Sequence, residues 1–478
     1  MTRVLEFVVA VIMVFILAVI VGLFLPSHAQ VQRSLEISHN PEHIYDILNN
    51  FRRFQDTAGA ALTAMDPGAK FTLSGPAYGP GAAISWKGNG AIGDGKLVNK
   101  SGHINVDNSS TITWDLTNDW HGFNKTFTFN VEPNERQTVS TVTWSYDVDY
   151  GWNLIGRYSQ LWIHGDPSTV IQVGLDNLQN TLAGIANVDY SKINPGLYRT
   201  SATPVLLVST KAERTVQDID TAKTAAMQDL QAALSKLGVN QAGPTTTIRT
   251  EWGDTTFIFD QVVPINTTTL TVDGKSYDLT KLPPPPTGGA PAPASSAASA
   301  SSAASAASAG APASAGSAGA PASASSAGAA PAPGSLDKHN RLIINANVRA
   351  MMLPAGEVLG ATWTGETGIQ FMVKALEAYS GTHGYAFNES AAPAFDQLVS
   401  LPTVSDDNQL YRVFLPVTDV PDQTPQQISG ATKPFPVLDP SLWTGNNTKP
   451  AEAKKAETGK KKPEARKHPE PAKKRHHR

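Results

Sequence analysis

The sequence has 478 residues and no cysteine. This absence excludes a disulfide-stabilised scaffold, a cysteine-ligated metal site and a cysteine nucleophile. Charge is absent from residues 283–334, which consist only of Pro, Thr, Gly, Ala and Ser. Acidic residues are scarce at the C-terminus, where residues 449–478 hold twelve Lys or Arg and four Asp or Glu. The formal net charge of −3 therefore conceals an acidic body with a basic tail, and a single compact globule is excluded.

One long apolar run is present, at the N-terminus. Residues 4–25 carry a single charge, Glu6, and as a helix they would span roughly 33 Å, close to the hydrocarbon thickness of a bilayer. We predict a transmembrane anchor within residues 1–30. Arg3 precedes the run, which favours a cytoplasmic N-terminus and places the body on the non-cytoplasmic (periplasmic or extracellular) side of a single-pass protein. A cleaved signal peptide is the alternative, because residues 27–29 (SHA) offer small side chains at a cleavage position.

Residues 31–190 follow an α+β pattern. A helix start at Asn40 is indicated by its capping side chain and the proline that follows, and a second, long helix is predicted from Asp166. Between them, alternating apolar runs separated by Gly, Pro, Asn and Asp predict an antiparallel meander that curves around the second helix. The predicted strands are 70–74, 82–87, 96–100, 111–116, 125–132 and 138–146.

Three segments of this region, 31–37 (VQRSLEI), 41–48 (PEHIYDIL) and 75–86 (GPAYGPGAAISW), carry a family resemblance. They resemble the START-like (SRPBCC) superfamily of polyketide cyclases and lipid-transfer proteins. The resemblance implies a helix-grip fold, in which a curved antiparallel sheet surrounds a long C-terminal helix, with a cavity for one hydrophobic ligand.

Aromatic residues are concentrated in the same region, where six of the nine tryptophans fall between residues 86 and 162. Aromatic side chains with a polar atom could line an apolar pocket, although ordinary core packing is the alternative for each of them. The candidate ligand-binding residues here are Trp86, Trp114, Trp120, Trp144 and Tyr146.

Residues 88–93 (GNGAIG) match the GxGxxG dinucleotide-binding pattern. That pattern binds a pyrophosphate only where a helix follows it, because the helix N-terminus meets the phosphates. The residues that follow here read as a turn and a strand. We therefore predict a hairpin turn and no nucleotide site.

The second half of the sequence contains a repeat. Residues 196–282 and 335–420 each show strands, one helix and further strands, with the helices predicted over 215–237 and 368–382. Two such copies predict a pseudo-twofold domain with a groove between its halves. The uncharged tract 283–334 separates the copies, so we interpret it as a disordered, expanded hairpin loop inside one domain, which costs little in chain entropy.

Residues 352–360 (MLPAGEVLG) and 411–417 (YRVFLPV) resemble the effector-binding domain of the gyrase-inhibitor-like (AraC/MerR-type) family. The resemblance implies binding of amphipathic, often cationic, small molecules through a glutamate on the last strand. Arg412 occupies that position here, and Asp260 occupies the equivalent position of the first copy. An acidic ligand on Arg412, an Asp260–Arg412 ion pair and plain solvated charges remain open. The candidate groove aromatics are Trp363, Tyr379 and Tyr411.

The motifs give little support to an enzyme. The sequence contains no GxSxG elbow, HExxH helix or phosphate loop, and we predict no metal and no cofactor. We therefore expect a membrane-anchored, non-catalytic binding protein for hydrophobic or amphipathic small molecules of lipid or polyketide type. A cyclase or small hydrolase is the alternative, with His121 beside Trp120 as acid or base or with Arg412.

An envelope scaffold is the third alternative, and it would depend on the uncharged tract and the tail. We expect residues 421–478 to be disordered and basic from residue 449, and to attract anionic lipid or an acidic envelope polymer. Nucleic acid is an unlikely partner, because the basic stretch contains no aromatic residue for base stacking.

Overall fold

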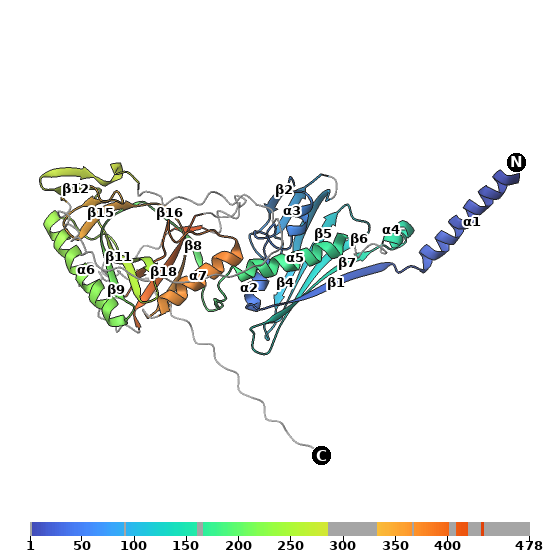
Figure 1. Ribbon diagram of the computed structural model, residues 1–478, viewed down its shortest axis with the longest axis horizontal. Coiled ribbons are helices and arrows are strands. Elements are labelled where there is room, and N and C mark those ends of the chain that lie inside the picture. Colours follow the sequence, from blue (N-terminus) through green and yellow to red (C-terminus); the bar gives the residue numbers. More distant parts are fainter. Residues whose placement is uncertain are drawn as a thin grey trace, which may run out of the picture.

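The computed structural model comprises an apolar helix, a seven-stranded sheet and a ten-stranded sheet, which follow one another along the long axis of the molecule (Figure 1). It describes residues 2–89, 92–159, 166–284, 332–365, 368–400, 408–418 and 432–434. Most of the uncharged tract and the whole basic tail lie outside these residues, so the expectations for them stay predictions.

Helix α1 (Thr2–Phe24) contains the N-terminal apolar run and projects away from the rest of the chain (Figure 1). Its residues 3–24 are long and apolar enough to cross a membrane. The predicted apolar helix is thus present. Strand β1 (His28–Ile37) follows within four residues and belongs to the first sheet.

The first sheet is antiparallel, with the strand order β1-β7-β6-β5-β4-β3-β2. Its other strands are β2 (Lys70–Ser74), β3 (Ala83–Lys87), β4 (Asp94–Ile104), β5 (Ser110–Asn118), β6 (Phe123–Pro133) and β7 (Ser140–Asp149). All six predicted strands are found, several of them longer than predicted. Strand β1, which we did not predict as a strand, pairs with β7 along its whole length.

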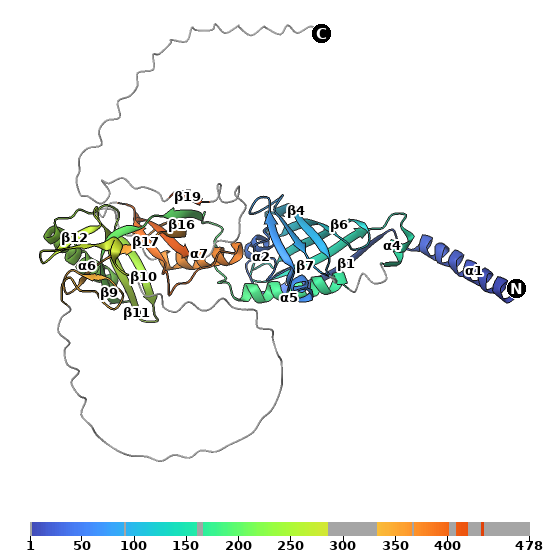
Figure 2. The ribbon, with the colours of Figure 1, turned by 90° about the horizontal axis from the view of Figure 1, so that it is seen from above.

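Helix α5 (Asp166–Ala183) lies along one face of this sheet (Figure 2). Its apolar stripe is buried in the same hydrophobic cluster as the inward-facing residues of the strands. Helices α2 (Pro41–Leu48) and α3 (Ala60–Met65) join that cluster, and α2 begins as predicted, because the side chain of Asn40 accepts a hydrogen bond from the backbone N–H of Glu42. The predicted α+β plan, a sheet gripping one long helix, is therefore present.

The described ends of the GNGAIG segment, residues 88–89 and 92–93, lie between β3 and β4. The backbone N–H of Gly88 donates to the carbonyl of Gly93, and β3 pairs with β4 directly after the turn. No helix follows it, so the turn lacks the helix N-terminus that a pyrophosphate site needs. Residues 90 and 91 lie outside the described part.

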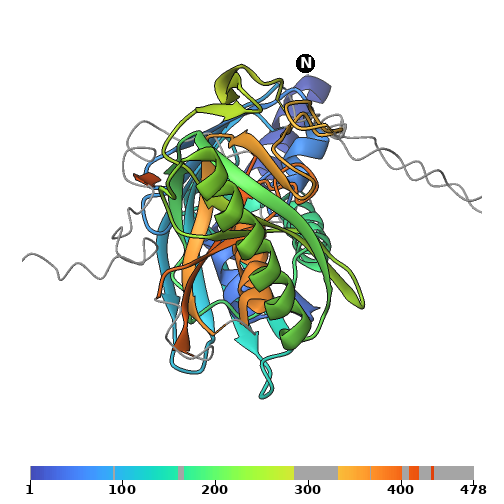
Figure 3. The ribbon, with the colours of Figure 1, turned by 90° about the vertical axis from the view of Figure 1, so that its left-hand side faces the viewer.

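The second sheet has the strand order β14-β15-β9-β11-β10-β17-β18-β16-β8-β19. Its strands are β8 (Gly196–Thr200), β9 (Thr203–Glu213), β10 (Thr246–Trp252), β11 (Thr256–Pro264), β14 (Leu342–Ile343), β15 (Val348–Leu353), β16 (Gly356–Thr364), β17 (Phe395–Leu398), β18 (Leu410–Val417) and β19 (Thr432–Pro434). Helices α6 (Val216–Leu237) and α7 (Ile369–His383) pack on it, and Figure 3 shows α6 crossing in front of the strands. A separate hairpin of β12 (Thr269–Val272) and β13 (Lys275–Asp278) was not predicted.

The strand order of this sheet is symmetric about the junction of β10 and β17. Reading outward, β10, β11 and β9 on one side correspond to β17, β18 and β16 on the other. In both sets one strand leads through a helix to a hairpin, and the strand preceding each set pairs with the opposite set. A buried ion pair closes the junction, because Arg249 Nε on β10 lies 2.9 Å from Asp396 Oδ1 on β17.

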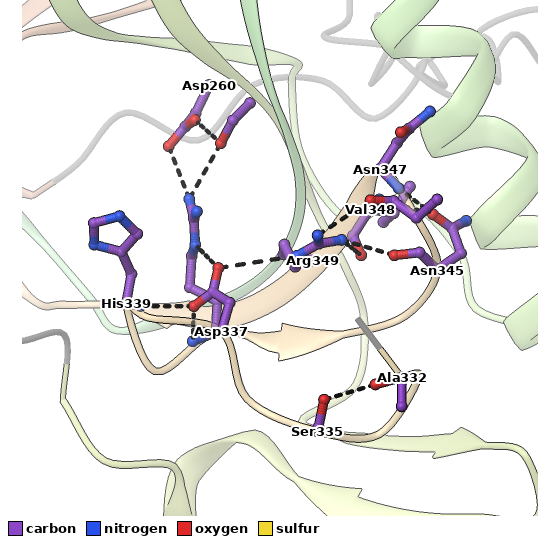
Figure 4. A network of polar contacts seen from close by, with 12 residues as sticks. Asp260, Ala332, Ser335, Asp337, His339, Asn345, Asn347, Val348 and Arg349 are labelled. Atoms are coloured by element: carbon purple, nitrogen blue, oxygen red, sulfur yellow. Dashed lines mark hydrogen bonds and ion pairs between the residues drawn. The ribbon is translucent and has the colours of Figure 1, made fainter. Parts of the chain in front are cut away.

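The two ends of the uncharged tract meet in the same part of the fold. Leu279 and Leu342 belong to one hydrophobic cluster, and Asn340 Nδ2 donates to the carbonyl of Pro284 over 2.7 Å. Asp337 fixes the returning chain by accepting hydrogen bonds from the backbone of His339 and from Arg341, as Figure 4 shows. The described flanks therefore leave and re-enter the fold close together, although the strands nearest to them, β13 and β14, belong to different sheets and do not form a hairpin with each other.

Helix α2 of the first sheet's domain packs against helix α7 of the second. Asn50 Nδ2 donates to the carbonyl of Thr382 and Arg52 Nη1 to that of His383. The guanidinium of Arg52 also lies over the ring of Tyr385, 5.1 Å from its centroid. Polar contacts with the last turn of α7 thus hold the two domains against each other.

Candidate functional site

The N-terminal domain contains a cavity of about 190 Å³ between its sheet, α3 and α5. It is lined by Phe54, Ala58, Leu62, Met65, Trp86, Ile92, Leu97, Leu116, Asn118, Trp120, Phe127, Trp144 and Val170. Twelve of these thirteen side chains are apolar or aromatic, and Asn118 is the single amide among them. Such a lining selects ligands by shape and apolar contact.

Two glycines make room for two of the tryptophans. Trp86 on β3 is paired with Gly95 on β4, and a Cβ on Gly95 would lie 2.1 Å from Cζ2 of the indole. Trp144 on β7 faces α5, where a Cβ on Gly174 would lie 2.4 Å from its Cζ3. Because no side chain larger than hydrogen fits at either glycine without movement, each indole is held in one position against backbone.

The indole N–H groups of Trp86 and Trp144 are buried and have no hydrogen-bond acceptor among the described residues. Trp114 differs, because its Nε1 donates to the carbonyl of Leu48 over 3.1 Å. A buried donor without an acceptor costs about 1–3 kcal/mol. Both nitrogens are enclosed by protein atoms and are not exposed to the cavity, so Asn118 is the one polar side chain that the lining offers to a ligand.

The loop at the rim of the cavity is held by a buried lysine. Lys125 Nζ donates to the carbonyl of Asn118, to Oδ1 of the same residue and to the carbonyl of Trp120, over 2.6–2.8 Å. Burial lowers the pKa of Lys125, and the charge of Asp119 opposes that shift. Lys125 therefore positions two lining residues, Asn118 and Trp120. We did not predict it, although its place in the alternating run KTFTFNV puts it on the inward face with Phe127.

Of the five aromatic residues predicted for this cavity, Trp86, Trp120 and Trp144 line it and two do not. Trp114 is a core residue next to Phe51 and Phe129. Tyr146 lies behind the rim, with its ring in edge contact with Trp120 at 5.5 Å, and burial raises its pKa.

His121, the candidate acid or base, is exposed on the loop beside Trp120. It makes no hydrogen bond or ion pair with the described residues. A general acid or base needs a partner that fixes its ring, so the geometry here gives this role no support.

In the C-terminal domain, Asp260 and Arg412 do not form the pair that we considered. Asp260 Oδ2 lies 3.5 Å from Nη1 of Arg341, and its other oxygen accepts from Ser209 (Figure 4). Strands β10 and β17 separate β11, which carries Asp260, from β18, which carries Arg412. Three strand spacings amount to about 14 Å, so the two charges act separately. Burial lowers the pKa of Arg412.

The predicted groove aromatics all belong to or border one hydrophobic cluster of the C-terminal domain. Trp363 on β16 and Tyr411 on β18 are cross-strand partners, and the Trp363 indole N–H, packed against Gly368, has no acceptor among the described residues. Tyr379 on α7 packs with Trp363 against the hydrophobic cluster that contains Tyr411, and its ring is also in edge contact with Tyr190 at 5.6 Å. That the three side chains line one groove stays a prediction.

The described residues contain no group of three or more His, Asp or Glu side chains placed to hold a metal ion. The described residues that could contact a small molecule in the N-terminal cavity are its apolar and aromatic lining and Asn118.

Comparisons with known proteins give a likeness of fold for about a third of the chain. No protein-family model and no curated protein matches the sequence. A point mutant of norcoclaurine synthase from Thalictrum flavum, solved with a transition-state analogue, is 13% identical, with a TM-score of 0.26 over 33% of this chain and 95% of that one. A protein from Nitrosospira multiformis is 14% identical, with a TM-score of 0.24 over 32% and 96%, and one from Thermobifida fusca is 16% identical, with a TM-score of 0.25 over 34% and 97%. Because all three TM-scores lie below 0.5, these likenesses carry no argument about the function of this chain.

Proposed function

We propose that this chain is a membrane-anchored, non-catalytic protein that binds a small hydrophobic or amphipathic molecule in the cavity of its N-terminal domain. The observation that carries the proposal is the cavity itself, in which twelve of the thirteen lining side chains are apolar or aromatic and Asn118 is the one amide. An apolar ligand would fill this cavity by shape, and one acceptor oxygen on it would meet the amide N–H of Asn118.

The cavity volume narrows the class of ligand. An engineered cavity of about 150 Å³ in another protein holds a benzene ring, and the cavity here is of similar size at about 190 Å³. The ligand is therefore a one-ring or short-chain compound, or one part of a longer molecule whose remainder leaves past the rim at Trp120. Ketones, esters and ethers of this size combine an apolar frame with an acceptor oxygen.

The anchor is the second element of the proposal. Helix α1 supports it by its length and apolar composition, and Arg3, in the first turn of α1, favours a cytoplasmic N-terminus, with both sheets on the other side. The symmetric strand order of the C-terminal domain supports its proposed origin as a duplicated, effector-binding-like unit.

Native mass spectrometry of the full-length protein, released from nanodiscs, tests the binding function. We expect a co-purifying or exchangeable small molecule. We also expect its loss in Ala58→Leu, which adds three carbons to a lining residue, and its retention in Ala64→Leu, which places the same side chain on the exposed side of α3. A protein that carries no exchangeable apolar molecule in either form would contradict the proposal.

A further inference from the structure

The chain is attached to α1 rigidly, through a short helix. Helix α4 (Leu154–Ser159) packs against the last two turns of α1, where Leu154 and Tyr158 flank Gly22. Tyr158 Oη donates to the carbonyl of Ala18 over 2.6 Å. The backbone N–H of Tyr150 donates to the carbonyl of Ser27, just after α1 ends. The N-terminal domain is therefore attached to α1 by packing and hydrogen bonds as well as through the connecting residues.

The end of α1 is capped by a buried arginine. Arg157 on α4 donates from Nη1 to the carbonyls of Leu23 and Leu25 at 3.0 and 3.1 Å, and from Nε to the carbonyl of Gly151 at 2.8 Å. The last carbonyl groups of a helix have no hydrogen-bond donor within the helix, and a positive charge at this end interacts favourably with the helix dipole. Because its donors are directed at backbone carbonyls, this guanidinium is compatible with a poorly hydrated environment.

The register of this contact sets the depth of α4. Ala18 lies six residues before the end of α1, which corresponds to about 9 Å along the helix axis. The 22-residue span 3–24, apolar except for Arg3 and Glu6, matches the hydrocarbon thickness only if nearly all of it is in the membrane. The end of α1 is then at the boundary between hydrocarbon and head groups, and α4, which contacts the last two turns, lies at this boundary and just inside it.

Three large apolar side chains lie on α4 or beside it without protein cover. Trp152 is 84% exposed, Ile155 76% and Phe123 50%. Phe123 lies against Gly151, the residue before Trp152, because a Cβ on that glycine would lie 3.1 Å from Cζ of the phenylalanine. We name Phe123, Trp152 and Ile155 the apolar rim. Trp is characteristic of the interface between lipid and water.

We propose that the apolar rim inserts into the head-group region of the bilayer that α1 crosses, so that the N-terminal domain sits on the membrane surface in a fixed orientation. The partner is a lipid surface, chosen because the rim continues the apolar surface of α1 through α4. This inference rests on the proposed anchor, and depth measurements at single labelled sites separate the two.

The absence of cysteine makes single-site labelling direct. Four full-length variants, Val11→Cys, Val106→Cys, Trp152→Cys and Ile155→Cys, are labelled with a nitroxide and reconstituted in nanodiscs of phosphatidylcholine and phosphatidylglycerol. Accessibility to oxygen, which partitions into lipid, is compared with accessibility to a water-soluble nickel chelate. Val11 is in the middle of α1 and Val106 is a fully exposed turn residue of the same domain, so they serve as lipid and water controls.

We expect the labels at 152 and 155 to favour oxygen over nickel by several-fold relative to 106, at depths shallower than 11. Insertion of the apolar rim is contradicted if the label at residue 11 is deep in the lipid while the labels at residues 152 and 155 are as accessible to the nickel chelate as the label at residue 106. Labels at 152 and 155 that are shielded from both reagents would also overturn it, since protein would then cover the rim. If the label at residue 11 is as accessible to the nickel chelate as the label at residue 106, both the membrane anchor and the insertion of the apolar rim are contradicted.

Discussion

The hydroxyl of Tyr190 donates a 2.7 Å hydrogen bond to Oδ2 of Asp46 at the junction of the two domains. Asp46 belongs to α2 of the N-terminal domain, and its other oxygen accepts from Tyr78, also over 2.7 Å. The same Tyr190 hydroxyl is 2.9 Å from Oγ1 of Thr382 at the end of α7. One buried carboxyl group is thereby connected through one tyrosine to both domains.

Replacing Tyr190 by phenylalanine should weaken this junction. The variant leaves Asp46 Oδ2 and Thr382 Oγ1 without their shared partner, which costs about 1–3 kcal/mol where a buried polar group loses its hydrogen bond. Urea unfolding of the full chain measures the difference. Tyr150→Phe is the matched control, because that hydroxyl makes no hydrogen bond with the described residues. Equal stability of the two variants would show that the junction does not depend on Tyr190.

Two neighbouring groups on α2 predict opposite dependences of stability on pH. Burial, followed by the charge of His39, lowers the pKa of His43 to about 4. Burial, followed by the charges of Asp46 and Asp189, raises the pKa of Glu42 to about 7. His383, on α7, also faces His43 and disfavours its protonation.

Between pH 6.5 and pH 4, His43 is protonated in the unfolded chain and largely neutral in the folded protein, because folding lowers its pKa. The free energy of unfolding therefore decreases as the pH falls, by at most about 1.4 kcal/mol per pH unit. Glu42 acts in the opposite direction, because below pH 7 the folded state holds its proton and stability increases as pH falls toward 4.5. Relative to the wild type, His43→Gln should gain stability as pH falls through this range, and Glu42→Gln should lose it. Parallel pH profiles of all three proteins, measured by urea unfolding, would contradict these pKa shifts.

Gly174→Ala should destabilise the N-terminal domain, although alanine is normally the better helix former by about 1 kcal/mol. The added Cβ would lie 2.4 Å from Trp144, so either the indole or α5 must move. Overpacking of this kind costs about 1–3 kcal/mol. Gly356→Ala is the control, since a Cβ there meets nothing within 4 Å. Thermal unfolding compares the two, and a stabilised Gly174→Ala would mean that Trp144 is not held against α5.

Lys125→Met should loosen the rim of the cavity while keeping most of the buried side-chain volume. Three acceptors, at Asn118 and Trp120, lose a charged donor, which costs about 1–3 kcal/mol of stability. Because the cavity walls stay in place and the rim moves more freely, ligand dissociation should speed up. Stopped-flow dissociation, with Lys100→Met as an exposed control on β4, measures this. An unchanged rate of ligand dissociation would show that Lys125 does not position Asn118 and Trp120 at the edge of the cavity.

Features that depend on nearby residues were predicted well from the sequence. Helix α6 starts after Thr215, whose hydroxyl accepts from the backbone N–H of Asp218, and ends at Gly238 with a positive φ of 66°. Both signals lie within a few residues of the helix end that they determine. The β12–β13 hairpin was not predicted, because it lies apart from both large sheets and its turn at Asp273 and Gly274 was not weighed as a hairpin signal.

The site depended on contacts between residues far apart in the sequence. Whether a tryptophan presents a free N–H is decided by an acceptor such as the carbonyl of Leu48, 66 residues from Trp114. Likewise, Asp260 pairs with Arg341 and not with Arg412 because of the strand order, which composition and spacing do not determine. Lys125 is different, since the alternation of its own strand already placed it on the inward face.

The binding of matched small ketones and alkenes tests the central claim most directly. Acetophenone and α-methylstyrene have nearly the same shape, and only the ketone carries an acceptor oxygen. If the amide N–H of Asn118 is the donor that the cavity offers to a ligand, calorimetry with the full-length protein should show tighter binding of acetophenone by about 2- to 10-fold, the value of one net hydrogen bond.

That preference should disappear in Asn118→Leu and persist in Trp114→Phe, a core residue that does not line the cavity and whose N–H is already bonded to Leu48. Equal affinity for the two compounds in the wild type, or no binding of either, would contradict the proposed site.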